Sequence, residues 1–191
     1  NDESVDYKLL YEGLKKENPQ IEIVRLYKMI PESLVGRIMY LIHLIGPQMH
    51  AFATAKVVVL DGYSISASVL KHRKDLKIIQ MWHAMGSLKR FGYATLDKKE
   101  GSSGNTARAF HMHENYDFIF ASSKNCMPAL SKAYGNPVEK FVEMSLPRTD
   151  LLTDDTYMKQ MKQVIMDKYP RLKEKRNILY TPTFRKNTDM K

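Results

Sequence analysis

The chain has 191 residues, of which 43% are apolar and 27% are charged, so it can fold around a core and is neither a disordered tail nor a collagen-like repeat. Its 30 Lys and Arg residues outnumber 21 Asp and Glu residues, and the resulting net charge of +9 predicts an anionic partner: nucleic acid, a phosphorylated substrate or an anionic membrane surface. A single cysteine, Cys126, excludes an intramolecular disulfide framework and a cysteine-rich zinc module.

The first quarter of the chain predicts helices and one strand. Tyr7 to Lys16 has apolar residues at helical spacing, and a second helix is expected from Pro31 to about Ile45, stopped by Gly46-Pro47. Between them, Ile21 to Tyr27 alternates apolar and polar residues, which predicts a strand. A short helical stretch is expected at residues 48–54.

Strand and helix patterns alternate through the middle of the chain. The continuous β-branched run from Lys56 to Leu60 is typical of a strand buried on both faces of a parallel sheet. Ser123 is expected to cap the helix that follows it. The remaining expected elements are helices at 66–72, within 83–109, at 125–134 and at 154–168, and strands at 76–82, 117–121 and 141–145. This alternation predicts an α/β fold with a mainly parallel sheet.

The last segment predicts a domain boundary. A charged connector, Arg171 to Arg176, precedes a strand pattern at Asn177 to Thr181, and the sequence stops soon afterwards. A strand without a following helix indicates the first element of a second domain. We therefore expect residues 1–170 to form one α/β domain, and residues 171–191 to supply the connector and first strand of a domain that the chain lacks.

Neither a signal peptide nor a membrane-spanning segment is predicted. The start, Asn1 to Glu3, is acidic and polar, and the absence of Met means that residues can precede it. The longest apolar stretch, Leu34 to Pro47, contains Arg37 and His43 and is shorter than the roughly 18 apolar residues that a membrane span needs.

The densest group of reactive residues is QMWHAMGSLKRFG at 80–92. His83 directly follows a predicted strand, at the edge where open α/β sheets bind their ligands. Ser87 is placed to cap a helix carrying Lys89 and Arg90, and a helix N-terminus beside cations is a natural phosphate site. A histidine there suits a general base, because its ordinary pKa of roughly 6.5 lies near working pH. The alternative is a structural histidine beside a solvated Lys-Arg pair.

The second motif is LPRTD at 146–150, again at the end of a predicted strand. Arg148 is able to bind a phosphate through two parallel hydrogen bonds, and Asp150 is placed to orient it or a hydroxyl. The alternative is an ordinary turn in which Asp150 caps a helix.

The third motif is YTPTFR at 180–185. Thr183 and Arg185 follow the last predicted strand, and both side chains suit phosphate binding. The alternative is an ordinary strand exit without a ligand.

Metal binding is not favoured. His111 and His113 have a spacing that would place two imidazoles on one face of a strand, but only Glu114 and Asp117 accompany them. Cys126 lies in a helical pattern and is interpreted as a small core residue. We expect neither a metal nor another cofactor.

These motifs together resemble the CDP-glycerol glycerophosphotransferase family, the teichoic-acid primases and polymerases. The resemblance rests on QMWHAMGSLKRFGY (80–93), on FASSKN (120–125) with SLPRTDLL (145–152), and on ILYTPTFRK (178–186), with ATAKVVVLDGY (53–63) upstream. Two departures occur, at His83-Ala84, where many members have His-Gly, and at Asp61-Gly62-Tyr63, where other members vary more freely.

The resemblance implies a GT-B architecture, in which two Rossmann-like domains face a cleft and this chain is the N-terminal half. Residues 1–170 would then be the acceptor-side domain, and residues 171–191 would begin the nucleotide-binding domain. By analogy, His83 is the base that deprotonates the acceptor hydroxyl, which attacks the β-phosphate of CDP-glycerol and releases CMP. The phosphate-binding residues would be Lys89, Arg90, Arg148, Asp150, Thr183 and Arg185. The second family histidine would lie beyond Lys191, so the chain alone should be inactive.

The same resemblance implies the partners and the location. They are a CDP-glycerol or similar CDP-polyol donor, a lipid-linked polyol-phosphate acceptor and the cytoplasmic face of the cell membrane, which the enzyme would bind peripherally. The segment Leu34 to Ile45 would meet anionic headgroups together with neighbouring cations, each worth about 1 kcal/mol near the surface. These cations are Lys71, Arg73, Lys74 and Lys77. The alternative for this patch is a solvated rim.

Three competing functions remain at this stage. The two-domain pattern also suits a sugar-nucleotide glycosyltransferase of GT-B type, or a non-catalytic domain that binds an anionic polymer. A nucleic-acid-binding module is suggested only by the charge. Because the basic residues are dispersed and no paired aromatic-basic motif accompanies them, no nucleic-acid partner is expected.

Overall fold

The computed structural model describes residues 3–28, 33–86, 89–98 and 101–181. The chain divides into two compact units, Asn1–Asp150 and Leu151–Lys191, and each is described by itself. The first unit contains the sheet and the candidate site. The assignment of residues 171–191 to a further domain stays a prediction.

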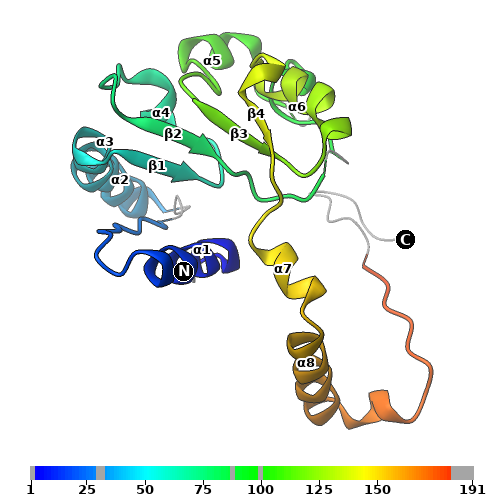
Figure 1. Cartoon of the computed structure of the whole chain (residues 1–191). Helices are drawn as coiled ribbons and strands as arrows, with labels where there is room; N and C mark the ends of the chain where they lie inside the picture. The colour runs from blue at the N-terminus through cyan, green and yellow to red at the C-terminus, as the bar shows by residue number, and fades with distance from the viewer. Residues whose placement is uncertain (1–2, 29–32, 87–88, 99–100, 182–191) are drawn as a thin grey trace. The chain divides into compact units, whose positions relative to one another are not determined.

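The first unit is built on a four-stranded sheet in which every pairing is parallel (Figure 1). The strands, in spatial order, are β1 (Val57–Leu60), β2 (Lys77–Gln80), β3 (Phe118–Ala121) and β4 (Phe141–Glu143). Val58 pairs with Ile78, and Ile119 pairs with Phe141. Because the strands are parallel, their carboxyl ends share one edge, which carries the loops after all four strands. The predicted α/β class and parallel sheet are therefore confirmed.

Helices precede the sheet and connect its strands. The chain enters through α1 (Val5–Glu17), α2 (Leu34–His43), the π-helical turn η1 (Leu44–Gln48) and α3 (Met49–Thr54). The strands are connected by α4 (Ile65–Val69), by η2 (Gly92–Thr95) with α5 (Gly104–Ala109), and by η3 (Lys124–Cys126), α6 (Met127–Tyr134) and η4 (Val138–Lys140). After β4 come α7 (Arg148–Thr153), which crosses the boundary between the units, and α8 (Asp155–Lys168) with η5 (Pro170–Lys173) in the second unit.

The core of the first unit lies between the sheet and the helices that connect its strands. Ile78 and Ile119 occupy the two central strands and are 1% and 0% exposed. Leu130 and Tyr134 on α6 belong to the same buried cluster, as does Tyr116 just before β3. Burial of each large side chain contributes about 1.5–3 kcal/mol, so this cluster stabilises the positions of the strand ends.

Two helix N-caps agree with the sequence pattern, and a third predicted cap does not form. Ser33 and Asp154 cap α2 and α8, because their side-chain oxygens accept backbone N–H groups of the first turn. Ser123 does not cap the helix after β3: its hydroxyl lies 3.3 Å from the Cys126 sulfur and makes no cap hydrogen bond.

Two predicted strands are absent. Residues 21–27 and 177–181 are both described, and neither segment is a strand. The alternating pattern at 21–27 leaves Val24 and Tyr27 exposed, because none of the strands in the described residues pairs with this segment. Ile178 is 90% exposed, so the apolar run at 177–181 has no core to pack against within the described chain.

Three local expectations also prove wrong. Gly46-Pro47 does not stop a helix, since the missing N–H of Pro47 is absorbed within the π-helical turn that joins α2 to α3. Lys89 and Arg90 are not helical, and Ser87 lies outside the described residues. The β1 run is not buried on both faces, because β1 is an edge strand of the described sheet and Val57 is 52% exposed.

Gly135, which follows the C-terminal end of α6, should resist replacement. It ends α6 in the left-handed conformation, with φ of 64°, and an added Cβ would lie 2.8 Å from Tyr93 Cδ2. We expect Gly135→Ala to lower the free energy of unfolding by about 1–3 kcal/mol. Gly13, inside α1, is the control, because its Cβ would meet nothing within 4 Å and Gly13→Ala should raise stability by about 0.5–1 kcal/mol. Urea unfolding measures both, and equal effects would contradict the assignment.

Candidate active site

His83 lies just after β2, at the carboxyl edge of the sheet, and its side chain is exposed. Its ring Nδ1 is 2.7 Å from the backbone carbonyl oxygen of Asp61, which follows β1. A carbonyl oxygen only accepts hydrogen bonds, so Nδ1 must carry the hydrogen. In the neutral imidazole this leaves the Nε2 lone pair unprotonated, which is the form that a general base requires.

Trp82 orients the ring of His83 from one side. The indole and imidazole centroids are 4.0 Å apart, and the indole stacks on Phe91 with centroids 4.3 Å apart and planes at 17°. Trp82 has a left-handed backbone with φ of 67°, which is unfavourable for a bulky residue. The stacking and a 2.8 Å hydrogen bond from its N–H to Gln80 Oε1 hold it there.

Gln80 connects the loops that leave β1 and β2. Its side chain is fully buried, and its amide nitrogen donates to the Gly62 carbonyl oxygen at 2.9 Å. Its amide oxygen accepts the N–H of Trp82. Both ends of the amide therefore make hydrogen bonds. The side chain of Gln80 thus fixes the position of Gly62, after β1, relative to Trp82, after β2.

Helix α1 reaches the same edge through Tyr7. The hydroxyl of Tyr7 accepts the N–H of Asp61 at 2.9 Å and donates to the Val59 carbonyl oxygen at 3.3 Å. Burial, together with the nearby Asp61 charge, raises the pKa of Tyr7 well above its usual value. The hydroxyl therefore stays protonated and makes both contacts.

Arg148, at the start of α7, is paired with Asp6 of α1. The Asp6 carboxylate is 1% exposed and accepts the backbone N–H of Arg148 at 2.8 Å, its Nε–H at 2.6 Å and its Nη2–H. These hydrogen bonds raise the pKa of Arg148, and Asp61 adds to the effect electrostatically. The guanidinium is thus committed largely to an internal carboxylate, while 37% of the side chain stays exposed.

The other predicted phosphate-binding residues are placed as follows. Lys89 and Arg90 are exposed in the loop that begins with His83. Asp150 is exposed in the first turn of α7 and is therefore not a helix cap, and its N–H donates to the Pro147 carbonyl oxygen. Thr183 and Arg185 lie outside the described residues. A role in phosphate binding stays a prediction for all of them.

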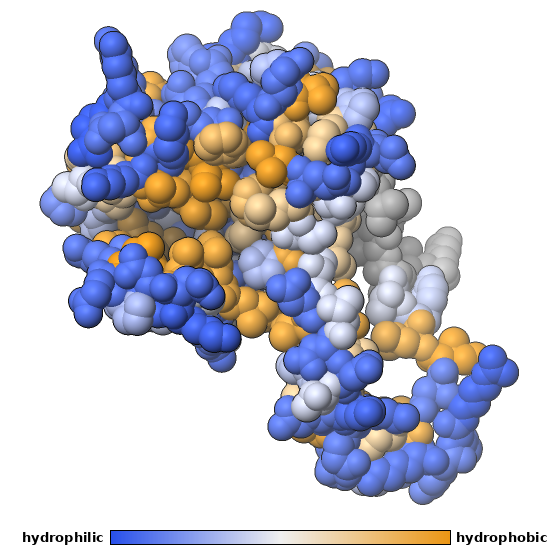
Figure 2. Space-filling model, in the orientation of Figure 1, coloured by the Kyte–Doolittle hydropathy of each residue, from blue (hydrophilic) through white to orange (hydrophobic). Residues whose placement is uncertain are grey.

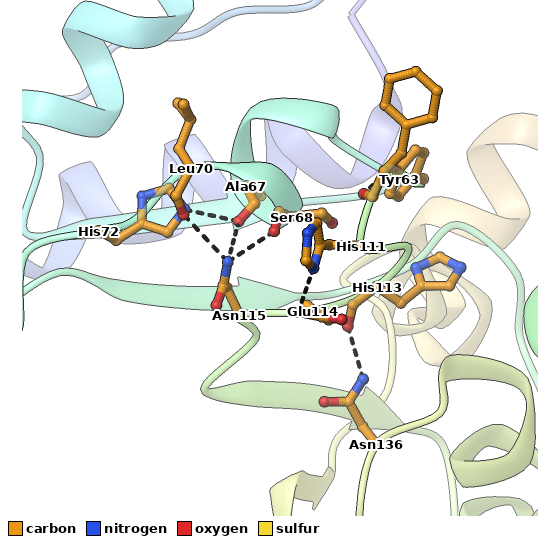
Figure 3. A network of polar contacts seen from close by, with 11 residues as sticks. Tyr63, Ala67, Ser68, Leu70, His72, His111, His113, Glu114, Asn115 and Asn136 are labelled. Atoms are coloured by element: carbon orange, nitrogen blue, oxygen red, sulfur yellow. Dashed lines mark hydrogen bonds and ion pairs between the residues drawn. The ribbon is translucent and has the colours of Figure 1, made fainter. Parts of the chain in front are cut away.

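His113 lies in a turn before β3. It is buried, and its Nδ1 lies 3.2 Å from the Tyr116 hydroxyl. Its carbonyl oxygen accepts an N–H of Asn136 at 2.8 Å (Figure 3). With Tyr134 and other residues that precede β3 and β4 it lines a cavity of about 370 Å³. The cavity is connected to His83 through aromatic rings: Phe91 lies 6.2 Å from the His113 ring and stacks on Trp82, whose ring centroid is 4.0 Å from that of His83.

The two histidines of the His111-Met112-His113 motif do not share a face of a strand. They lie in turns before β3 with left-handed backbones, with φ of 46° and 64°, and His111 pairs with Glu114 at 3.1 Å. Asn115, also left-handed, donates to the carbonyl oxygens of Ala67, Ser68 and Leu70 at the end of α4 (Figure 3). In the described part of the chain, no three His, Cys, Asp or Glu residues are grouped to hold a metal.

The comparisons with known proteins decide the family. The profile of CDP-glycerol:poly(glycerophosphate) glycerophosphotransferases matches residues 1–191. The chain belongs to this family. It is 33% identical over 182 residues to the teichoic acid ribitol-phosphate primase of Bacillus spizizenii, and 32% identical over 144 residues to the teichoic acid glycerol-phosphate primase of Bacillus subtilis. These matches cover 95% and 75% of the chain but 46% and 36% of the relatives, so the chain spans less than half of either protein.

Solved structures agree on the fold. The wall teichoic acid polymerase TagF, in a structure with CDPG, aligns with 87% of the chain and 42% of its own, with a TM-score of 0.60 at 16% identity. A second TagF structure aligns with a TM-score of 0.57. The aligned part therefore has the GT-B-like fold of this polymerase, as the sequence motifs predict.

The sequence motifs locate His83 but miss what holds it. Tyr7 and Asp6 lie in a helix whose pattern is merely amphipathic, and nothing local marks them as contacts of a strand exit. Asp61 acts here through its backbone carbonyl, which any residue type supplies. Of these residues, only Gln80 could have been recognised from the local sequence. A polar residue at the end of a buried apolar strand requires hydrogen-bond partners.

His113 should make the folded chain sensitive to acid. Burial lowers its pKa to about 4, below the value of roughly 6.5 in an unfolded chain. The unfolded state therefore binds more protons between pH 4 and 6.5, and the free energy of unfolding should fall by up to about 3 kcal/mol as pH drops through that window.

The measurement is urea unfolding of the native chain and of His113→Gln at several pH values from 7 to 4. The variant should lose most of this pH dependence, because glutamine does not titrate. His111→Gln is the matched control, since His111 is exposed, and it should retain the native slope. A His113→Gln curve parallel to that of the native chain would show the expectation to be wrong.

Proposed function

We propose that this chain is the acceptor-side part of an enzyme that transfers glycerol phosphate, or a related polyol phosphate, from a CDP-activated donor to a lipid-linked polyol-phosphate acceptor. The observation that carries the proposal is the contact of His83 Nδ1 with the Asp61 carbonyl, which leaves Nε2 as a base at the ligand-binding edge of the sheet. Family membership supplies the reaction class.

The reaction we propose is a direct displacement at phosphorus. Nε2 of His83 takes the proton of the acceptor hydroxyl while its oxygen bonds to the β-phosphorus of the CDP-polyol. The bond from that phosphorus to the oxygen bridging the two phosphates breaks, and its electron pair leaves with CMP. Phosphoryl transfer depends mainly on positioning and on charge stabilisation, which suits the rigid setting of this histidine.

Cations near His83 would stabilise the phosphate charge. Lys89 and Arg90 are exposed on the same loop and are the candidates for this role. We propose a mainly structural role for Arg148, because its guanidinium pairs with buried Asp6. Only the exposed part of its side chain is available to a ligand. Thr183 and Arg185 stay candidates on the sequence motif alone.

The proposal includes a second domain. The chain spans 46% of the ribitol-phosphate primase that it resembles, and the sheet described here ends with β4. We propose that the cytidine nucleotide is held by a domain that follows this one, for which residues 171–191 supply the connector and a segment, 177–181, that becomes the first strand beside the other strands of that domain. On this proposal the chain alone does not complete the reaction.

His83→Gln should abolish transfer in the complete enzyme. Loss of a general base lowers kcat by about 10²–10⁴-fold, and glutamine keeps the size and polarity of the side chain. His111→Gln, at an exposed histidine in the turn before β3 that pairs with Glu114, is the control and should retain native turnover. The measurement is CMP release from CDP-glycerol and from CDP-ribitol with a lipid-linked acceptor.

The same assay separates the competing functions. Native-level turnover by His83→Gln would refute the assignment of the base. Turnover of UDP-sugars in place of CDP-polyols would indicate a sugar-nucleotide glycosyltransferase, and acceptor binding without turnover of any donor would indicate a non-catalytic polymer-binding domain.

We further propose that α2 binds an anionic membrane surface peripherally, on the cytoplasmic side. Large apolar side chains stand exposed along this helix and the turn that follows it, and the hydrophilic surface in Figure 2 is interrupted by such side chains (orange). They are Leu34, Val35, Ile38, Met39, Leu41, Ile42 and Ile45, each at least half exposed. In the described part of the chain no helix has the length and apolar character to cross a membrane.

Charge supports this surface. From Ser33 to Leu60 the sequence contains no Asp or Glu, while it contains Arg37 and Lys56. Arg73 donates to the carbonyl oxygens of Ala53 and Ala55, which brings the basic loop 71–74 to the end of α3. Lys77 is less available, because it pairs with Asp117 at 3.0 Å. An apolar helix face with cations beside it is the pattern of an interfacial helix.

Ile38→Glu with Ile42→Glu should weaken binding to vesicles. The two carboxylates remove apolar contact and repel anionic headgroups, so we expect at least a tenfold loss of co-sedimentation with phosphatidylglycerol vesicles. Val138→Glu, at an exposed apolar residue of η4, is the control and should bind like the native chain. Equal binding of the native chain to anionic and neutral vesicles would refute the electrostatic part of this proposal.

A further inference from the structure

We propose that Tyr7 is a positioning residue for His83: its hydroxyl holds the segment whose Asp61 carbonyl keeps the imidazole protonated on Nδ1. The inference rests on the function proposed above, because it explains how the base is prepared. It assigns to α1, a helix outside the sheet, a part in the site.

The contact between Asp61 and His83 determines the tautomer only if the carbonyl stays in place. Asp61 and Gly62 form the turn that leaves β1, where the ladder to β2 ends with the bond from the Met81 N–H to the Leu60 carbonyl oxygen. Beyond that bond, the orientation of the Asp61 carbonyl depends on what holds the neighbouring peptide groups.

Two side chains, half-buried Tyr7 and fully buried Gln80, hold the peptide groups on either side of Asp61. The Tyr7 hydroxyl accepts the Asp61 N–H at 2.9 Å, which fixes the peptide before the residue. The Gln80 amide donates to the Gly62 carbonyl at 2.9 Å, which fixes the peptide after Gly62. The Asp61 carbonyl lies between these two anchors, so its direction toward His83 Nδ1 is set from both sides.

The hydroxyl of Tyr7 makes two hydrogen bonds to the backbone at the end of β1. It accepts the Asp61 N–H and donates to the Val59 carbonyl with the same oxygen, so one hydroxyl satisfies two backbone groups of the β1 exit. Phenylalanine would leave both groups without these partners at a cost of about 1–3 kcal/mol for each that stays dry, which favours rotation of the peptide toward water. A rotated peptide would release the Nδ1–H of His83.

The direct test is the tautomer of His83, read from long-range ¹H–¹⁵N spectra of the chain labelled at its six histidines. His83→Gln identifies the signal. In the native chain the neutral ring should carry its hydrogen on Nδ1. In Tyr7→Phe the Nε2-protonated form, which free imidazole side chains prefer, should become the major one.

The matched control is Tyr11→Phe on the same helix. Arg25 lies over the ring of Tyr11 at 4.4 Å, and phenylalanine keeps that contact, so this variant should retain the native tautomer. If Tyr7→Phe does not fold, site-specific replacement of Tyr7 by difluorotyrosine keeps the ring and hydroxyl but weakens the acceptor, and should raise the Nε2–H population. A native chain with hydrogen on Nε2, or a folded Tyr7 variant that keeps the native tautomer, would overturn the proposal.

Turnover in the complete enzyme provides the second readout. Tyr7→Phe should lower kcat about tenfold with KM unchanged, because the base is misprotonated while substrate contacts remain. The two proposals fail separately: the spectra involve no transfer reaction and can contradict the role of Tyr7 alone, whereas native turnover by His83→Gln contradicts the base whatever its tautomer.

Discussion

The candidate site depends on a carboxylate that is buried in the first turn of α1. Asp6 is almost fully buried and accepts three N–H groups of Arg148, so the start of α7 is tied to the helix that opens the chain. A buried charge without such a partner would cost several kcal/mol, which makes the pairing obligatory. Its neighbour Tyr7 ties the β1 exit to the same helix. Two successive residues thus join the exits of both outer strands.

Within this frame, the inner contacts leave one imidazole nitrogen of His83, Nε2, without a hydrogen. Gln80 joins the exits of β1 and β2, Trp82 stacks against the ring, and a backbone carbonyl takes the Nδ1 hydrogen. If His83 is the base, as we propose, its function depends on these supporting contacts as much as on the histidine itself, because rigid placement lowers the cost of a proton transfer.

The sequence predicts the sheet well, because β-branched runs and their spacing reflect local requirements. It fails at residues 21–27 and 177–181, where the pattern allows a strand but pairing requires a neighbour that the described chain does not supply. It places His83 just after β2, where the structure has it. It does not predict the contacts of Asp6 and Tyr7, because hydrogen bonds to residues 142 and 54 positions away leave no trace in the local pattern.

That separation has a consequence for how the molecule assembles. Helix α1 is made before α7, and the partner of Asp6 is made 142 residues later, which at 5–20 residues per second is a delay of roughly 7–28 s during synthesis. Through that interval the Asp6 carboxylate lacks its Arg148 partner, and α1 is not yet tied to the segment after β4. The sheet can be nucleated by its own parallel crossovers, but the edge that carries His83 acquires its final geometry only when Arg148 arrives.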